Sequence, residues 1–217
     1  MIIKNLLDRL LSGLIILPIS LFFVFKGSYF FMSFLILCMI LSLIEWNNMM
    51  KIMSLKFLGI LFIFFSFFST YQIRTENEND QSLKLFLLIL FVCISTDIGG
   101  YIFGNIFKGP KLTKISPNKT YSGVIGGFSC SLIFIYLIII VFNFFNKSNL
   151  NFDLKLIWYI LFFSLISQIG DLIISYFKRL SNVKDTGKLI PGHGGILDRI
   201  DGMIFVYPTV YILKFFF

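Results

Sequence analysis

The sequence predicts an all-α fold, a polytopic bundle of about seven transmembrane helices, and three observations support this class. Hydrophobic residues fill 57% of the 217 positions and charged residues only 14%, whereas soluble domains carry about 45–50% apolar and about 25% charged residues. The mean hydropathy is +0.88. The apolar residues form continuous runs without the two-residue alternation of a membrane barrel. Because a backbone in hydrocarbon must satisfy its own hydrogen bonds, these runs are predicted to be helices.

Seven apolar runs have, or nearly have, the length of about 17 to 25 residues that a membrane span needs. They cover residues 10–25, 28–44, 57–73, 83–107, 121–145, 154–177 and 202–217. The first run follows Lys4 and Arg9 but has no small-residue cleavage site, so we interpret it as a retained helix. We find no internal repeat and no extramembrane domain, and we therefore expect one membrane domain over residues 1–217.

The distribution of basic residues sets the expected orientation. Most of the 19 Lys and Arg residues fall in alternate connections, which the positive-inside rule assigns to the cytoplasm together with the N-terminus. The two long polar connections, residues 108–120 and 178–201, then lie on the same cytoplasmic side, where nucleotides are found.

Two carboxylates, Asp97 and Asp171, lie inside otherwise apolar runs. A charged side chain in a membrane costs at least about 2.5–3.5 kcal/mol, so such residues face a cavity or a partner and are candidates for function. The alternative is a structural carboxylate that bonds to a neighbouring helix. Asp97 shares the helical spacing i, i+3, i+4, i+7 with Gly100, Tyr101 and Gly104, and these glycines let another backbone or a ligand approach closely.

The segment 175–201 combines cations, carboxylates and glycines. Its cations are Lys178, Arg179, Lys184, Lys188 and Arg199. Lys and Arg bind phosphate, and the glycines Gly194 and Gly195 allow backbone amides to turn toward anions. Asp198 and Asp201 are three residues apart, so on the opening turn of the last helix they would project to one side and could hold Mg²⁺ with substrate phosphates. The pattern favours a Mg²⁺-nucleotide site over a basic loop that attracts anionic lipid.

His193 is the only histidine. We favour a phosphate contact or a structural role for it over general acid–base catalysis. A zinc site is disfavoured because further His or Cys ligands are lacking nearby. Neither a P-loop nor a dinucleotide-binding fingerprint occurs in the chain.

A second anion-binding environment is predicted before the run at 121–145. Ser116, Lys119 and Thr120 precede a glycine-rich helix start, where the helix dipole favours negative charge. Glu45 and Trp46, at the inner end of the second run, are interpreted as an interfacial anchor rather than as part of the site.

These residues resemble the motifs of the phosphatidate cytidylyltransferases, or CDP-diacylglycerol synthases. The segment that resembles the family signature contains Ser175, Lys178-Arg179, Lys184-Asp185, Gly187, Ile190-Pro191, His193-Gly194-Gly195-Ile196 and Asp198-Arg199-Ile200-Asp201. Further similar blocks are Glu45-Trp46, Asp97-x-x-Gly100-Tyr101-x-x-Gly104, Ser116-Pro117-x-Lys119-Thr120, Gly126-Gly127 and Gly170-Asp171-Leu172. The chain departs from the family in being short and in carrying Tyr121-Ser122 where many members have Trp or Glu before the glycine.

The resemblance implies transfer of CMP from CTP to phosphatidic acid, with Mg²⁺ as cofactor and room for a second cation. It implies a catalytic half at roughly 83–217. The implied catalytic residues are Lys178, Arg179, Lys184, Asp185, His193 and Arg199. The implied substrate-binding residues are Ser116, Lys119, Thr120, Ser175, Lys188, Gly194 and Gly195. The implied metal ligands are Asp171, Asp198 and Asp201, with Asp97 as a further candidate.

The expected location is a bacterial inner membrane, crossed several times, with the site facing the cytoplasm. Membrane lipid is an expected partner, nucleic acid is not, and homodimer formation is left open. Two other functions are weighed, a CTP-dependent lipid-alcohol kinase and an anion transporter that uses the same basic pocket.

Overall fold

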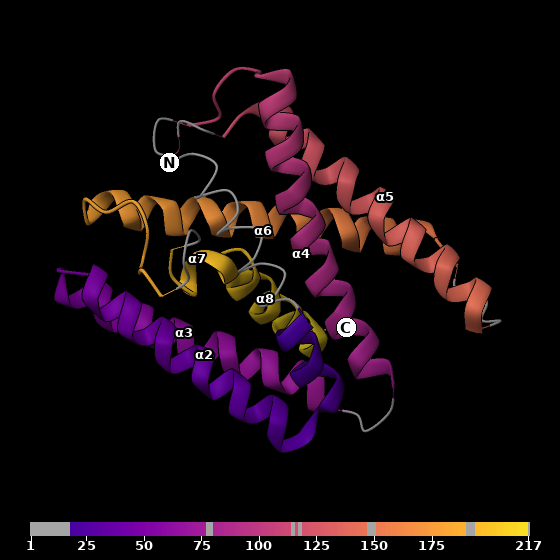
Figure 1. Cartoon of the computed structure of the whole chain (residues 1–217), viewed down its shortest axis with the longest axis horizontal. Helices are drawn as coiled ribbons and strands as arrows, with labels where there is room; N and C mark the ends of the chain where they lie inside the picture. Colours follow the sequence, from indigo (N-terminus) through magenta and orange to yellow (C-terminus); the bar gives the residue numbers. More distant parts are fainter. Residues whose placement is uncertain are drawn as a thin grey trace. The chain divides into compact units, whose positions relative to one another are not determined.

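The computed structural model describes residues 18–76, 80–113, 116, 119–146, 151–189 and 194–216, and every regular element within them is a helix (Figure 1). A short helix over residues 18–26 comes first. The labelled helices are α2 (Ser28–Met49), α3 (Met53–Thr75), α4 (Asp80–Phe107), α5 (Tyr121–Asn146), α6 (Leu154–Leu180), α7 (Leu197–Ile200) and α8 (Met203–Phe216). The predicted all-α class is confirmed.

Five helices, α2 to α6, are long and apolar enough to cross a membrane, which confirms a polytopic membrane protein. The last predicted span is shorter than expected, because its apolar part runs only over Met203–Lys214. At 1.5 Å per residue, the 14 residues of α8 extend about 21 Å, less than the bilayer core of about 30 Å. Most of the first predicted run, residues 10–25, lies outside the described residues.

The chain forms two compact units. Unit 1 comprises Met1–Leu83 and Phe177–Phe217, and unit 2 comprises Lys84–Tyr176. The single membrane domain expected over residues 1–217 stays a prediction.

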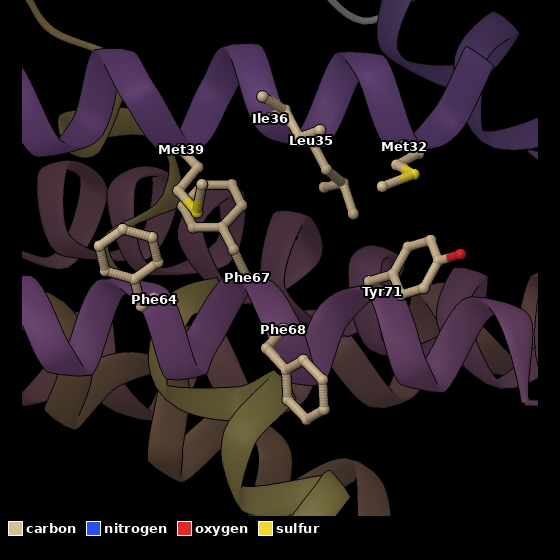
Figure 2. Close-up of a pocket in the computed structure, with 8 residues that line it drawn as sticks. All are labelled: Met32, Leu35, Ile36, Met39, Phe64, Phe67, Phe68 and Tyr71. Atoms are coloured by element: carbon tan, nitrogen blue, oxygen red, sulfur yellow. The ribbon is translucent and has the colours of Figure 1, made fainter. Parts of the chain in front are cut away.

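In unit 1, α3 packs against both α2 and α8. The three helices are held mainly by buried apolar side chains, among which Phe31, Ile63 and Val206 are almost fully enclosed. One polar contact crosses this packing, from Ser66 Oγ of α3 to the Ile204 carbonyl of α8, at 2.8 Å. An apolar cavity of about 190 Å³ lies between α2 and α3 (Figure 2). Apart from the Tyr71 hydroxyl, its lining consists of aliphatic, methionine and phenylalanine side chains, so it offers few polar groups.

In unit 2, glycines bring α4 and α5 into close contact. A Cβ atom at Gly99 would overlap the Gly126 carbonyl and the Cys130 side chain, and a Cβ at Gly123 would lie 2.8 Å from the Gly100 carbonyl. Among the α4 glycines, the closest approach is thus at Gly99, which was not predicted; at the predicted Gly100 and Gly104 a Cβ would lie 3.7 Å from the Gly123 carbonyl and 3.7 Å from the Gly123 Cα, so the α5 backbone lies beside both. A buried hydrogen bond of 2.8 Å from Thr96 Oγ1 to Ser164 Oγ joins α4 to α6.

Candidate functional site

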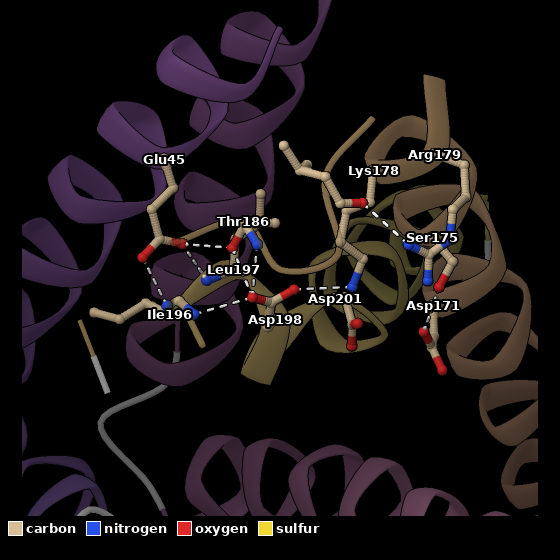
Figure 3. Close-up of polar contacts among 12 residues, drawn as sticks. Glu45, Asp171, Ser175, Lys178, Arg179, Thr186, Ile196, Leu197, Asp198 and Asp201 are labelled. Atoms are coloured by element: carbon tan, nitrogen blue, oxygen red, sulfur yellow. Dashed lines mark hydrogen bonds and ion pairs between the residues drawn. The ribbon is translucent and has the colours of Figure 1, made fainter. Parts of the chain in front are cut away.

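The connection between α6 and α8 folds around the carboxylate of Asp198 (Figure 3). Lys178 Nζ donates to Asp198 Oδ1 at 2.8 Å. Asp198 Oδ2 accepts the backbone N–H groups of Thr186 at 2.8 Å and Gly195 at 2.9 Å, and the Thr186 hydroxyl lies 3.0 Å from the same oxygen. One carboxylate thus connects the end of α6, the middle of the loop and the beginning of α7.

This carboxylate is held as a charged group although it is nearly buried. The side chains of Lys178 and Asp198 are 11% and 4% exposed. Burial by itself would raise the pKa of Asp198, but the hydrogen bond from Lys178, the backbone bonds from Gly195 and Thr186 and the Lys178 charge together hold the pKa below its ordinary value. Charge-assisted hydrogen bonds of this kind are about twice as strong as neutral ones. The site is therefore an ionised carboxylate, hydrogen-bonded at both oxygens, beside an ammonium group.

Glu45 of α2 contributes a second buried carboxylate to this loop (Figure 3). It accepts hydrogen bonds from the Thr186 hydroxyl and from the N–H groups of Ile196 and Leu197. The expectation that Glu45 serves as an interfacial anchor outside the site is wrong. A usable signal was present in the sequence, because a carboxylate at the end of an apolar run carries the same desolvation cost that singled out Asp97 and Asp171.

Two glycines make the close approach of these carboxylates possible. Gly194 has φ +85°, a conformation that side chains rarely adopt, and a Cβ there would lie 2.7 Å from Asp198 Oδ2. A Cβ at Gly195 would overlap both the Glu45 carboxylate and the Thr186 hydroxyl. The Gly195 amide does turn toward an anion, as the sequence suggested, but that anion is Asp198 of the protein itself.

Asp198 and Asp201 do not share the opening turn of the last helix. Asp198 lies in the separate four-residue helix α7, and α8 begins only at Met203. Between them, Asp201 Oδ1 accepts the N–H of Gly202 at 3.0 Å, a local side-chain bond that competes with helical pairing. Both carboxylates are buried.

The other predicted cations of the segment 175–201 are exposed, whereas Lys178 is buried. Arg179, Lys184, Lys188 and Arg199 are exposed, as is Asp185. Arg179 Nη1 donates to the Val183 carbonyl at 3.1 Å, which ties the loop to the end of α6. The exposed set leaves positive charge at the surface of the loop, whereas Lys178 neutralises charge inside it.

In unit 2, Lys119 Nζ and Asp171 Oδ2 form an ion pair of 2.6 Å, with side chains 25% and 29% exposed. The Ser175 hydroxyl lies 3.3 Å from Asp171 Oδ1 (Figure 3). Two predicted site segments, before α5 and within α6, are thereby joined. Asp97 lies on α4 with an exposed side chain.

Thr120 caps α5. Its Oγ1 accepts the N–H of Gly123 at 3.1 Å and lies 2.9 Å from Ser122 Oγ, as expected of an N-cap residue. Ser116 accepts the Lys119 N–H through its carbonyl at 3.0 Å. The predicted roles of Ser116 and Thr120 in substrate binding stay predictions. His193 lies outside the described residues, and its predicted role stays a prediction too.

The carboxylates fit the chemistry of a magnesium ligand. Asp171 and Asp198 offer the hard oxygen atoms that Mg²⁺ prefers, and each faces an ammonium group, so both positions favour positive charge. Because Asp198 Oδ2 already has three donors, Oδ1 is its oxygen with remaining capacity. Among the described residues, no group of three or more His, Cys, Asp or Glu side chains could hold an ion. The predicted metal ligands Asp97, Asp171, Asp198 and Asp201 stay predictions.

Fold and site together define a multi-pass helical membrane protein whose polar loop combines buried carboxylates with exposed cations. A model of the cytidylyltransferase family matches residues 53–217. A phosphatidate cytidylyltransferase of Rickettsia conorii is 34% identical over 98% of this chain and 93% of its own length, and one of Rickettsia felis is 35% identical over 97% and 93%. One of Staphylococcus haemolyticus is 48% identical over 60% of this chain and 49% of its own length. The chain belongs to the cytidylyltransferase family.

Proposed function

We propose that this protein is a phosphatidate cytidylyltransferase, which transfers CMP from CTP to phosphatidic acid and yields CDP-diacylglycerol and pyrophosphate. The observation that carries the proposal is the match to relatives of that name along nearly the whole chain. The loop around Asp198 supports it, because the loop combines buried and exposed cations at the end of membrane helices.

In the proposed reaction, a phosphate oxygen of phosphatidic acid attacks the α-phosphorus of CTP. The bond between the α-phosphorus and the bridging oxygen breaks, and pyrophosphate leaves with the electron pair. A phosphate oxygen is already ionised at neutral pH, so the protein has to position the reactants and offset negative charge. The exposed cations Lys184, Lys188 and Arg199 suit contact with the triphosphate and the lipid phosphate. Lys178, fixed by Asp198, supplies a preoriented ammonium group.

We further propose Mg²⁺ as the cofactor, with the carboxylate of Asp198 as a ligand. The bound ion would offset charge on the triphosphate and the departing pyrophosphate. We place the protein in the inner membrane of a bacterium with the loop on the cytoplasmic side, because most basic residues fall in the connections assigned to that side.

Purified protein in detergent–lipid micelles, supplied with labelled CTP and phosphatidic acid, tests the proposal. CDP-diacylglycerol and pyrophosphate should appear in equal amounts, and chelation of divalent ions should stop the reaction. A phosphorylated lipid alcohol formed from CTP would indicate the kinase alternative instead. Anion flux into reconstituted vesicles without a CDP-lipid product would indicate a transporter.

A further inference from the structure

Glu45 is a buried carboxylate whose hydrogen-bond partners among the described residues lie far from it in the sequence. It lies at the end of α2, before the first residue of the family match, and is 3% exposed. Its three partners belong to the loop that carries Asp198. The Thr186 hydroxyl lies 2.9 Å from Oε2, the Leu197 N–H 2.9 Å from Oε2 and the Ile196 N–H 2.8 Å from Oε1. A buried charge is costly unless it is hydrogen-bonded, and these donors offset that cost.

The Thr186 hydroxyl connects Glu45 to Asp198. Its oxygen lies 2.9 Å from Glu45 Oε2 and 3.0 Å from Asp198 Oδ2. A hydroxyl carries one proton, so the two carboxylates share a single donor at this position. Any displacement of Glu45 therefore changes how Thr186 bonds to Asp198. Because Asp198 Oδ1 bonds to Lys178 at 2.8 Å, the displacement also reaches the ammonium group.

Trp46, the next residue of α2, contacts the helix segment that carries Lys178. The ring of Trp46 packs edge-on against Phe177, with centroids 5.2 Å apart, and Phe177 immediately precedes Lys178. Trp46 Nε1 also donates to the Lys56 carbonyl at 3.2 Å. Its ring fits because residue 59 is a glycine, where any Cβ would overlap the indole. The end of α2 thus contacts the segment bearing Lys178 and the segment bearing Asp198.

We propose that Glu45 is a positioning residue for CMP transfer. Through Thr186 and the N–H groups of residues 196 and 197 it fixes the loop, and so the direction in which Asp198 holds Lys178. The effect of Glu45 on the rate of CMP transfer rests on the proposed function. Glu45 need not touch a substrate, so its loss should lower the rate of the chemical step more than substrate affinity.

The test compares Glu45→Gln with Ser42→Ala, which removes another buried polar group of α2 whose hydroxyl bonds only one turn back, to the Cys38 carbonyl. The amide of Glu45→Gln has one accepting oxygen, so it cannot satisfy all three donors. We expect kcat to fall by up to about 100-fold, since a misplacement of about 1 Å can cost that much, with KM for CTP and phosphatidic acid near the wild-type values. Ser42→Ala should keep the wild-type kcat. A kcat for Glu45→Gln equal to that of Ser42→Ala, or a loss confined to KM, would overturn the proposal.

A second pair of variants tests the link through Thr186 and serves if Glu45→Gln does not fold. Thr186→Val keeps the shape and removes the hydroxyl, and should lower kcat. Thr186→Ser keeps the hydroxyl and should retain most of the activity. If Glu45 acts through this hydroxyl, the double variant Glu45→Gln, Thr186→Val should lose no more than the worse single variant. Equal kcat for the two Thr186 variants, or losses that multiply in the double variant, would contradict the link.

Amide hydrogen exchange separates failure of this proposal from failure of the proposed function. In the detergent-solubilised protein without substrates, the backbone N–H groups of residues 196 and 197 should exchange faster in Glu45→Gln than in Ser42→Ala. Unchanged exchange would show that Glu45 does not fix the loop, whatever the reaction is. If the wild-type protein forms no CDP-lipid but Glu45→Gln shows the faster exchange, the proposed function is overturned and Glu45 remains the residue that orders the loop.

Discussion

Replacing Asp198 with Asn tests the buried ion pair with Lys178. The amide can still accept the N–H groups of Thr186 and Gly195 through its oxygen, but its NH₂ group then faces the Lys178 ammonium at the position where the carboxylate lay 2.8 Å away. Two donors then face each other, and the ammonium loses its countercharge. Removing one partner of a buried ion pair costs about 3–5 kcal/mol, and side chains only 11% and 4% exposed place this pair in that class.

This cost is large beside the total stability of about 5–15 kcal/mol that a protein has. For a chain of this size it corresponds to a fall of about 6 to 20 °C in the unfolding temperature. Heating the detergent-solubilised protein and measuring the fraction that stays monodisperse gives that temperature. The matched control is Glu76→Gln, which breaks the Lys214–Glu76 pair, 2.6 Å long but 31% and 48% exposed. An exposed pair contributes at most about 1 kcal/mol, so the control should unfold close to wild type.

The double variant Lys178→Met, Asp198→Asn separates stability from activity. It removes both charges, so neither is left buried without a partner, and most of the lost unfolding temperature should return. CMP transfer should be absent from this double variant, because the preoriented ammonium group is gone. An Asp198→Asn protein that unfolds with the wild type, or a double variant no more stable than Asp198→Asn alone, would refute the assigned ion pair.

Three further predictions address acid stability, nucleotide binding and helix packing. Because the pKa of Asp198 is lowered from 3.8 in the folded protein, its contribution to stability is complete above pH 3.8 and is lost as the pH falls through the lower, folded-state pKa. Acid unfolding curves should show this loss of stability in the wild type and a smaller loss in Lys178→Met. Lys119→Ala should raise KM for CTP with a smaller effect on kcat in steady-state assays, and an unchanged KM would remove Lys119 from the nucleotide site. Gly99→Ala should destabilise the protein by about 1–3 kcal/mol through overpacking, whereas Gly100→Ala, whose Cβ would lie 3.7 Å from the nearest atom, should be tolerated in the same thermal assay.

The helices were largely predictable from the sequence. The runs predicted at 121–145 and 154–177 correspond to α5 (Tyr121–Asn146) and α6 (Leu154–Leu180). Hydropathy locates such helices because a backbone in hydrocarbon has few alternatives to a helix. The break between α7 and α8 was not predictable in this way, because it depends on local hydrogen bonding at Asp201 and Gly202.

By itself, the sequence determined which chemical groups the site contains: a loop with Lys178, Asp198 and two consecutive glycines, and carboxylates within apolar runs. Only the tertiary structure decided which group binds which. It pairs Lys178 with Asp198, turns the Gly195 amide toward that carboxylate, and brings Glu45 from α2 to the same loop. The physical reason is that composition and spacing reveal charge and flexibility along the chain, whereas hydrogen bonds act over about 3 Å between segments that only folding brings together.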